Sequence, residues 1–215
     1  MTNEAPRRTA AVDPRRRAPG AGRRRDPAID EKLRHAARLL YAREGWAGFH
    51  FEGVARAAGV SKDAVYRRYA DPQALLLDAL SDQSVPMLAA DRPVEEALIA
   101  FATDTLAYFS SGSGYANLRV HVDGAQHPKV LEEYRTRVVE PQLAQAVDVL
   151  ERARQAGELD PGVSPSAVIE ALGGAVMLYA LAAAPPAAAD SPDEATLRQL
   201  TVFVRQILHG RGNGC

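Results

Sequence analysis

The sequence contains one cysteine, Cys215, at its last position. A disulfide within the chain and a zinc site built on several thiolates both need more cysteines, so the sequence excludes both. Such sparing use of cysteine fits a reducing, intracellular setting. The N-terminus also lacks the apolar stretch and small-residue cleavage site of a secretory signal. We therefore expect a cytoplasmic protein.

Long apolar runs and catalytic motifs are missing as well. The most apolar segment, residues 171–184, has 14 residues and falls short of the roughly 18 that suggest a membrane span. The five histidines show no metal-binding spacing, and neither a phosphate-binding glycine loop nor a serine nucleophile elbow occurs. These absences predict no metal, no cofactor, no catalysis and no membrane contact.

The net charge of −1 hides a strong asymmetry along the chain. Residues 1–80 hold 16 Lys/Arg against 10 Asp/Glu, whereas residues 81–215 hold 10 against 17. Eight arginines lie in residues 1–25, a segment rich in Pro, Ala and Gly without apolar periodicity. We expect a disordered arm attracted to a polyanion. A solubilising tail, or a start site placed too early, is the alternative.

Helical periodicity dominates the rest of the chain, and no alternating strand pattern occurs, so the fold class is all-α. Asp26-Pro27 begins a first helix that should end at Gly45. Helices at 51–58, 61–69 and 71–80 complete a small N-terminal domain, residues 26–80. Gly59 forms the turn before the third helix, and Ser61 caps that helix.

Residues 81–215 read as a larger helical domain. Helices are expected near 94–106, 115–122, 128–155 and 164–184, and Pro141 should kink the third of them. Ser191 and Glu194 predict a capping box that begins the last helix, which ends before Gly210.

The two short helices at 51–58 and 61–69, joined by a tight turn, fit the geometry that places a recognition helix in the DNA major groove. The second helix carries four side chains expected to point outward, Lys62, Tyr66, Arg67 and Arg68. Arginine can grip guanine through two hydrogen bonds, while lysine and tyrosine can hold phosphates. The residues alone are compatible with DNA binding, and equally with a helix-turn-helix in a helical protein that does not bind DNA.

The run VARAAGVSKDAVYRRY at 54–69, followed by DPQALL at 71–76, resembles the DNA-binding domain of the tetracycline-repressor (TetR) family. The resemblance implies that Lys62, Asp63, Ala64 and Arg67 lie nearest the bases, and that Tyr66 and Arg68 meet phosphates. His50 stands where the family usually has a Ser or Thr, so its helix cap should be weaker. The predicted DNA-binding residues are His50, Ser61, Lys62, Asp63, Ala64, Tyr66, Arg67, Arg68 and Tyr69, although Tyr69 also fits the core.

Residues 81–215 resemble the family's regulatory domain more loosely. The resemblance implies a homodimer through the last two helices, about 164–184 and 192–209, because the first of these is apolar nearly all round. It also implies a pocket for a small-molecule inducer among the middle helices. Its candidate lining residues, each more simply explained as part of an ordinary core, are Phe101, Tyr108, Phe109, Tyr115, His121, Tyr134, Met177 and Tyr179.

The sequence thus predicts a dimeric, sequence-specific regulator that binds a near-palindromic double-stranded operator and represses transcription until a ligand releases it. Two alternatives stay open. One is a non-specific, nucleoid-type DNA binder that acts through the arginine arm. The other is a regulator controlled by a protein partner, or one without any ligand.

Overall fold

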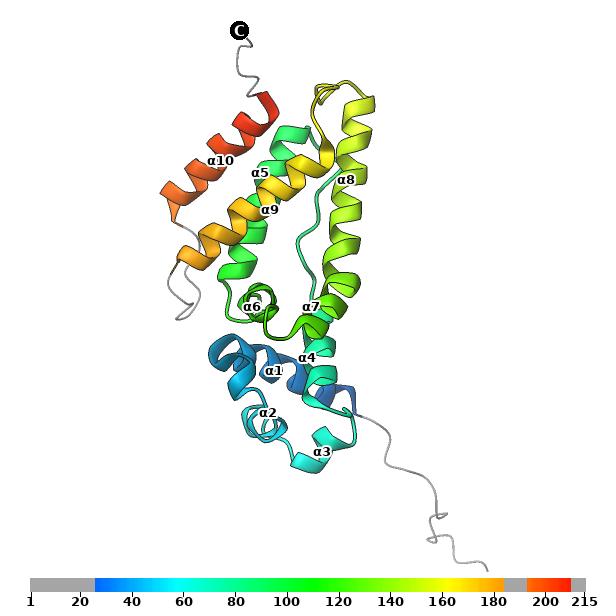
Figure 1. Ribbon diagram of the computed structural model, residues 1–215, viewed down its shortest axis with the longest axis vertical. Coiled ribbons are helices and arrows are strands. Elements are labelled where there is room, and N and C mark those ends of the chain that lie inside the picture. The colour runs from blue at the N-terminus through cyan, green and yellow to red at the C-terminus, as the bar shows by residue number, and fades with distance from the viewer. Residues whose placement is uncertain (1–25, 184–192, 210–215) are drawn as a thin grey trace, which may run out of the picture.

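A computed structural model describes residues 26–183 and 193–209, and within these ranges every regular element is helical (Figure 1). The predicted arginine arm lies outside the described residues. The elements are α1 (Pro27–Gly48), α2 (Phe51–Ala58), α3 (Lys62–Tyr66), α4 (Pro72–Ser81), α5 (Val94–Ser110), α6 (Tyr115–Asp123), α7 (Pro128–Tyr134), the π-helical segment η1 (Arg135–Val139), α8 (Glu140–Gln155), α9 (Pro165–Ala182) and α10 (Glu194–His209).

The N-terminal helices form a bundle in which α1 packs against α2 and α4. Its fully buried side chains include Leu33, Val54, Val65 and Leu76. The same apolar cluster continues into α6 and α7, which lie between this bundle and the other helices (Figure 1). A movement of α6 or α7 would therefore change the packing of the N-terminal bundle directly.

The second apolar cluster is built by α5, α8, α9 and α10. Helix α9 packs on α5, α8 and α10, yet much of its surface stays open. Leu178 is 69% exposed, and Leu181 is 43% exposed. By length and composition alone α9 is also long and apolar enough to cross a membrane, so the 14-residue stretch read from the sequence underestimated it. Its packing on three neighbours is that of a core helix with one bare face.

Pro141 disturbs the helix around it, as the sequence predicts. The disturbance takes the form of a change from α-helical to π-helical hydrogen bonding. A proline in a helix lacks an N–H, and its ring crowds the carbonyl four residues earlier. The chain from Pro128 to Gln155 stays helical and accommodates Pro141 by the π-helical segment just before it. There the Glu140 N–H donates to the Arg135 carbonyl, five residues back.

Among the helix boundaries that differ from the prediction, two have clear local causes. Helix α3 ends at Tyr66 rather than at Tyr69, because the Arg68 N–H donates to the Val65 carbonyl three residues back and tightens the chain into a turn. Helix α10 begins at Glu194, where the Asp193 side chain accepts from the Thr196 N–H at 2.8 Å. The predicted cap, Ser191, lies outside the described residues, and Asp193 performs that role.

Gly45 leaves the helical conformation near the end of α1, with φ 66° and ψ −166°. Carbonyls of the preceding turn find a donor on α6, where the Arg119 guanidinium donates to the Ala42 oxygen at 2.9 Å. A second link joins the same helices, because the Tyr41 hydroxyl donates to Asp123 at 2.8 Å. The break in α1 thus fits the side chains of α6.

Candidate functional site

The turn between α2 and α3 is fixed by backbone hydrogen bonds. Gly59 adopts a left-handed conformation, with φ 65° and ψ 33°. The Val60 N–H then reaches back to the Ala55 carbonyl at 3.0 Å. The Ser61 hydroxyl accepts from the Ala64 N–H at 3.3 Å and caps α3 as predicted. The orientation of α3 against α2 is therefore set locally.

One face of α3 is open to solvent. Exposed residues at its start and end are Ser61, Lys62, Asp63, Tyr66 and Arg67. Arg67 forms no side-chain hydrogen bond or ion pair with the residues that the structure describes. This face therefore presents two cations, a carboxylate and hydroxyl groups on one short helix, as a groove-reading element requires.

Three predicted DNA-binding residues are directed inward. Ala64 is 5% exposed and Tyr69 is 7% exposed. The Tyr69 hydroxyl donates to Asp78 of α4 at 2.6 Å, and burial is the main reason that its pKa is raised. The outward orientation predicted for Arg68 is wrong. Its Nε lies 2.5 Å from Asp30 Oδ1, and its Nη1 donates to the Ala64 carbonyl.

The Arg68–Asp30 pair is nearly closed to solvent, since the two side chains are 8% and 11% exposed. A buried carboxylate is costly unless a cation and hydrogen bonds compensate it. Arg68 supplies that compensation and ties α3 to α1. Its role in the structure is therefore to hold α3 in place.

Glu52, on α2, organises part of the exposed face. The Tyr66 hydroxyl donates to Glu52 at 3.1 Å, and the Lys62 ammonium lies 3.5 Å from the same oxygen. The pKa of Glu52 is lowered, first by its own backbone N–H and then by Tyr66. Residue patterning missed Glu52 and the exposed Arg56, although both lie on the polar side of the amphipathic α2.

His50 precedes α2 and is exposed. Its Nδ1 lies 2.8 Å from the Gly48 carbonyl, and its side chain makes no capping bond to α2. The weaker cap expected from replacing Ser or Thr is confirmed.

A cavity of about 110 Å³ lies among the middle helices, from α5 to α9. Six of the eight predicted residues line it: Phe101, Tyr108, Phe109, His121, Tyr134 and Met177. Tyr115 and Tyr179 do not line it, and Tyr179 instead donates to Gln199 of α10. The remaining lining residues are Val85, Pro86, Thr105, Val139, Gln142, Leu143, Ile169, Leu172, Gly173 and Val176.

The polar groups of this cavity are uncharged. Burial, assisted by Arg135, lowers the pKa of His121, so its imidazole is neutral at pH 7. Burial raises the pKa of Tyr134 to about 12 and also raises that of Tyr108. The hydroxyls of Thr105 and Tyr108 are buried and have no hydrogen-bond partner among the residues described. Sequence patterning missed Thr105, which lies one helical turn before Tyr108.

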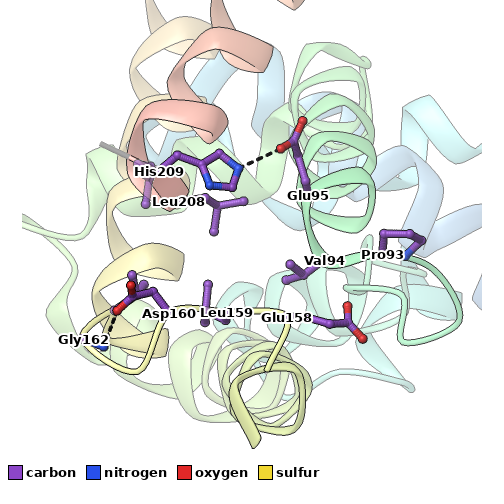
Figure 2. Close-up of a pocket in the computed structure, with 11 residues that line it drawn as sticks. Pro93, Val94, Glu95, Glu158, Leu159, Asp160, Gly162, Leu208 and His209 are labelled. Carbon is purple, nitrogen blue, oxygen red and sulfur yellow. Dashed lines mark hydrogen bonds and ion pairs between the residues drawn. The ribbon is translucent and has the colours of Figure 1, made fainter. Parts of the chain in front are cut away.

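A larger hollow, of about 580 Å³, opens where α10 ends beside the start of α5. Figure 2 shows Val94, Leu159 and Leu208 around it, with the carboxylates of Glu95, Glu158 and Asp160 nearby. Hydrogen bonds from Arg205 and His209 lower the pKa of Glu95. These contacts join α10 to the first turn of α5.

Among the residues described, no group of three or more His, Cys, Asp or Glu side chains could hold a metal ion.

Both parts of the chain match known families. Residues 33–79 match the model of bacterial regulatory proteins of the tetR family. Residues 90–199, more than half of the chain, match the tetracyclin repressor-like C-terminal domain. The chain belongs to the TetR family. The protein is therefore a DNA-binding transcriptional regulator of the helix-turn-helix type.

Curated TetR-type relatives include two bacterial HTH-type transcriptional regulators. AqdR of Rhodococcus erythropolis is 33% identical over 132 residues, which are 60% of this chain and 63% of AqdR. YdeS of Bacillus subtilis, described as uncharacterized, is 28% identical over 141 residues, or 64% of this chain and 71% of YdeS.

Solved TetR-family structures share the fold. PfmR of Thermus thermophilus is 19% identical with a TM-score of 0.61, covering 85% of this chain and 99% of PfmR. FadR of Bacillus subtilis, solved with stearoyl-CoA, is 11% identical with a TM-score of 0.64 over 85% of this chain and 99% of FadR.

Proposed function

We propose that the protein is a cytoplasmic, homodimeric repressor that reads a near-palindromic operator with α3 and is released by a small molecule. The observation that carries this proposal is the exposed face of α3, held by the Gly59 turn and the Arg68–Asp30 pair. Lys62, Asp63 and Arg67 read base edges, and Tyr66 holds a phosphate. Outside α3, His50 and Arg56 supply further phosphate contacts.

Dimerisation is proposed for the bare face of α9. Exposed small and apolar residues recur there in alternating steps of four and three, at Ala167, Ala171, Gly174, Leu178 and Leu181. This is the spacing of a seam between two packed helices. Val202 of α10, 53% exposed, extends the apolar surface to the second helix of the interface. A twin copy would cover this face and set the distance between the two recognition helices.

A chain of buried hydrogen bonds supports coupling between the cavity and the DNA-binding bundle. Tyr134 lines the cavity, and its hydroxyl accepts from Asn117 Nδ2 at 3.0 Å. Asn117, fully buried on α6, also donates to the Leu80 carbonyl of α4. A ligand that displaces Tyr134 must therefore disturb bonds that hold α4. Ligand and operator would weaken each other's binding by the same factor.

The decisive test is fluorescence anisotropy of the purified protein with the DNA upstream of its own gene and with a scrambled duplex, at two salt concentrations. Preference for the upstream DNA at both salts supports a sequence-reading repressor. Arg67→Ala should reduce that preference, whereas Arg92→Ala, an exposed arginine before α5, should not. Equal, strongly salt-dependent binding to both duplexes would instead favour the nucleoid-type reading.

The small size of the cavity favours a second candidate, a TetR-family repressor controlled by a protein partner or without a ligand. Ligand pockets commonly measure roughly 300–1,000 Å³, whereas this one measures about 110 Å³. Under that candidate, no small molecule that enters the cavity would change the affinity for the operator.

A further inference from the structure

We propose that the cavity among α5 to α9 binds a small, uncharged aromatic molecule whose oxygen accepts hydrogen bonds from Thr105 and Tyr108. This inference rests on the proposed ligand control and names the chemistry of the ligand. The proposed ligand has one ring, one hydrogen-bond acceptor and no net charge. Each of these properties is inferred from a different feature of the cavity.

The hydrogen-bond acceptor on the ligand is inferred from the hydroxyls of Thr105 and Tyr108. Thr105 and Tyr108 lie three residues apart on α5, so their side chains share one face of the helix. Both line the cavity, and both oxygens are buried without a hydrogen-bond partner among the described residues. A buried hydroxyl without a partner is unfavourable. Burial raises the pKa of Tyr108, so its hydroxyl keeps a proton to donate. A carbonyl oxygen can accept from both groups.

The absence of charge on the ligand follows from the lining, which contains no Asp, Glu, Lys or Arg. A carboxylate or ammonium group in this cavity would lose its water without gaining an opposite charge. Two arginines act electrostatically on lining residues, Arg38 on Tyr108 and Arg135 on His121, but neither lines the cavity, and Arg38 already donates to the Ala79 carbonyl at 3.0 Å. His121 does not compensate either, because burial holds it neutral at pH 7.

The single ring of the ligand is inferred from the aromatic residues that line the cavity and from the volume of the cavity. Aromatic residues make up 6% of the chain, yet the lining gathers four of them, Phe101, Tyr108, Phe109 and Tyr134. Aromatic side chains favour a planar ring through edge and offset contacts. An apolar cavity of about 150 Å³ can hold benzene; this cavity, at about 110 Å³, is smaller and leaves no room for more than one ring. It matches one small ring rather than a long acyl chain.

The test compares three probes of similar shape on the full-length protein by isothermal titration calorimetry and ligand-observed NMR. Acetophenone carries the ring and the acceptor, ethylbenzene lacks the acceptor, and benzoate carries a charge. Acetophenone should bind about five-fold more tightly than ethylbenzene, and benzoate should bind most weakly.

Variants test whether the hydroxyls of Thr105 and Tyr108 cause the preference for acetophenone over ethylbenzene. Thr105→Val and Tyr108→Phe remove one hydroxyl each with little change of shape, and each should weaken acetophenone about 3- to 10-fold while leaving ethylbenzene unchanged. Thr103→Val on the same helix and Tyr115→Phe on α6 are matched controls, because neither residue lines the cavity. Thermal melts of all four variants establish that each is folded.

The inference is overturned if benzoate binds best, if ethylbenzene equals acetophenone, if no probe binds, or if the hydroxyl variants behave like their controls. Failure of the proposed function gives a different result. If acetophenone binds as expected but leaves the affinity for the upstream DNA unchanged, the ligand chemistry stands and ligand-controlled repression fails.

Discussion

Arg67 and Arg68 are adjacent arginines with opposite surroundings. Arg67 is exposed on the recognition face, whereas Arg68 is buried against Asp30. Arg68→Met keeps the length of the side chain but removes the ion pair, so we expect the free energy of unfolding to fall by about 3 kcal/mol. Arg67→Met should leave it nearly unchanged. Urea denaturation of both variants measures the difference.

A double variant separates charge from packing at this pair. Asp30→Asn in the Arg68→Met background removes the buried carboxylate and should restore part of the lost stability. If Arg68→Met proves as stable as Arg67→Met, the buried pair does not hold α3 and the inward orientation of Arg68 is wrong.

We expect Glu52 to limit the affinity for DNA at the same face. Its pKa is lowered, so it is ionised at pH 7, and it lies beside Lys62, which would approach base edges, and Tyr66, which would approach a phosphate. Glu52→Gln keeps a hydrogen-bond acceptor and removes the charge. We expect about two- to five-fold tighter binding to every duplex at low salt, fading as salt rises.

Glu96→Gln is the control for Glu52→Gln, because Glu96 is an exposed carboxylate on α5, outside the DNA-binding bundle. Anisotropy titrations on the scrambled duplex give the comparison. An equal effect of both variants would mean that only net charge matters and that Glu52 does not face the phosphates.

At the scale of elements, two glycines shape the turns that position α2 and α3. Gly45 has φ 66° and ψ −166°, a region that essentially only glycine occupies, and an added Cβ would meet the Arg119 guanidinium. Gly59 has φ 65° and ψ 33°, with open space around its Cβ position. Gly45→Ala should cost about 3 kcal/mol and Gly59→Ala about 1 kcal/mol.

Chemical denaturation of the two alanine variants measures this ranking. The reverse order would show that the contact between α1 and α6 adapts easily, and that the rigidity of the α2–α3 turn is the larger contribution. Arg119→Met in the Gly45→Ala background tests the steric part, since it removes the guanidinium that the new methyl group would meet.

Element ends were predictable from the sequence where their chemistry is local. Asp26 and Ser61 each cap the helix that directly follows them, as expected. The start of α10 was missed because Ser191 and Asp193 are both good capping residues two positions apart. Pro141 predicted a distortion of the helix, but the sequence did not predict that the distortion would take the form of a π-helical segment.

Site residues were predictable only where the helix face alone decides exposure. Lys62 and Tyr66 lie outward as expected. The orientation of Arg68 depends on Asp30, which lies 38 residues away, and no local pattern links the two. The same limit explains the cavity. Aromatic residues in the middle helices were a good guide, but which side of its helix Tyr179 occupies depends on α10.

For the whole molecule, His121 makes stability depend on pH. Burial lowers its pKa in the folded state below the ordinary 6.5, so the unfolded chain takes up its proton first as pH falls. Stability from this group is therefore complete above about pH 6.5 and is lost as pH falls toward the folded-state pKa, by at most about 1.4 kcal/mol per pH unit.

His121→Gln should flatten the dependence of the urea midpoint on pH between about 7 and 5. His35→Gln is the control, because His35 is exposed on α1. The protein concentration is held constant, since dimerisation would also shift the midpoint. An equal loss of slope in both variants would show that burial of His121 is not the cause.

The proposed dimer would determine whether two copies of α3 act together on DNA. Leu178 is 69% exposed at the middle of the bare α9 stripe, where the proposed interface would bury it. A charge there would have to be desolvated opposite its own twin, so Leu178→Glu should give a monomer at micromolar concentration. Operator affinity should then fall at least about 100-fold, because each half-site would be bound separately.

Val122→Glu is the matched control, since Val122 is 55% exposed on α6 and lies outside α9 and α10. Analytical ultracentrifugation gives the mass of each variant, and anisotropy gives its affinity for the upstream DNA. A Leu178→Glu protein that stays dimeric places the interface elsewhere. A monomer that still binds the operator with full affinity means that one recognition helix is enough, and that a ligand could not act by changing the distance between two.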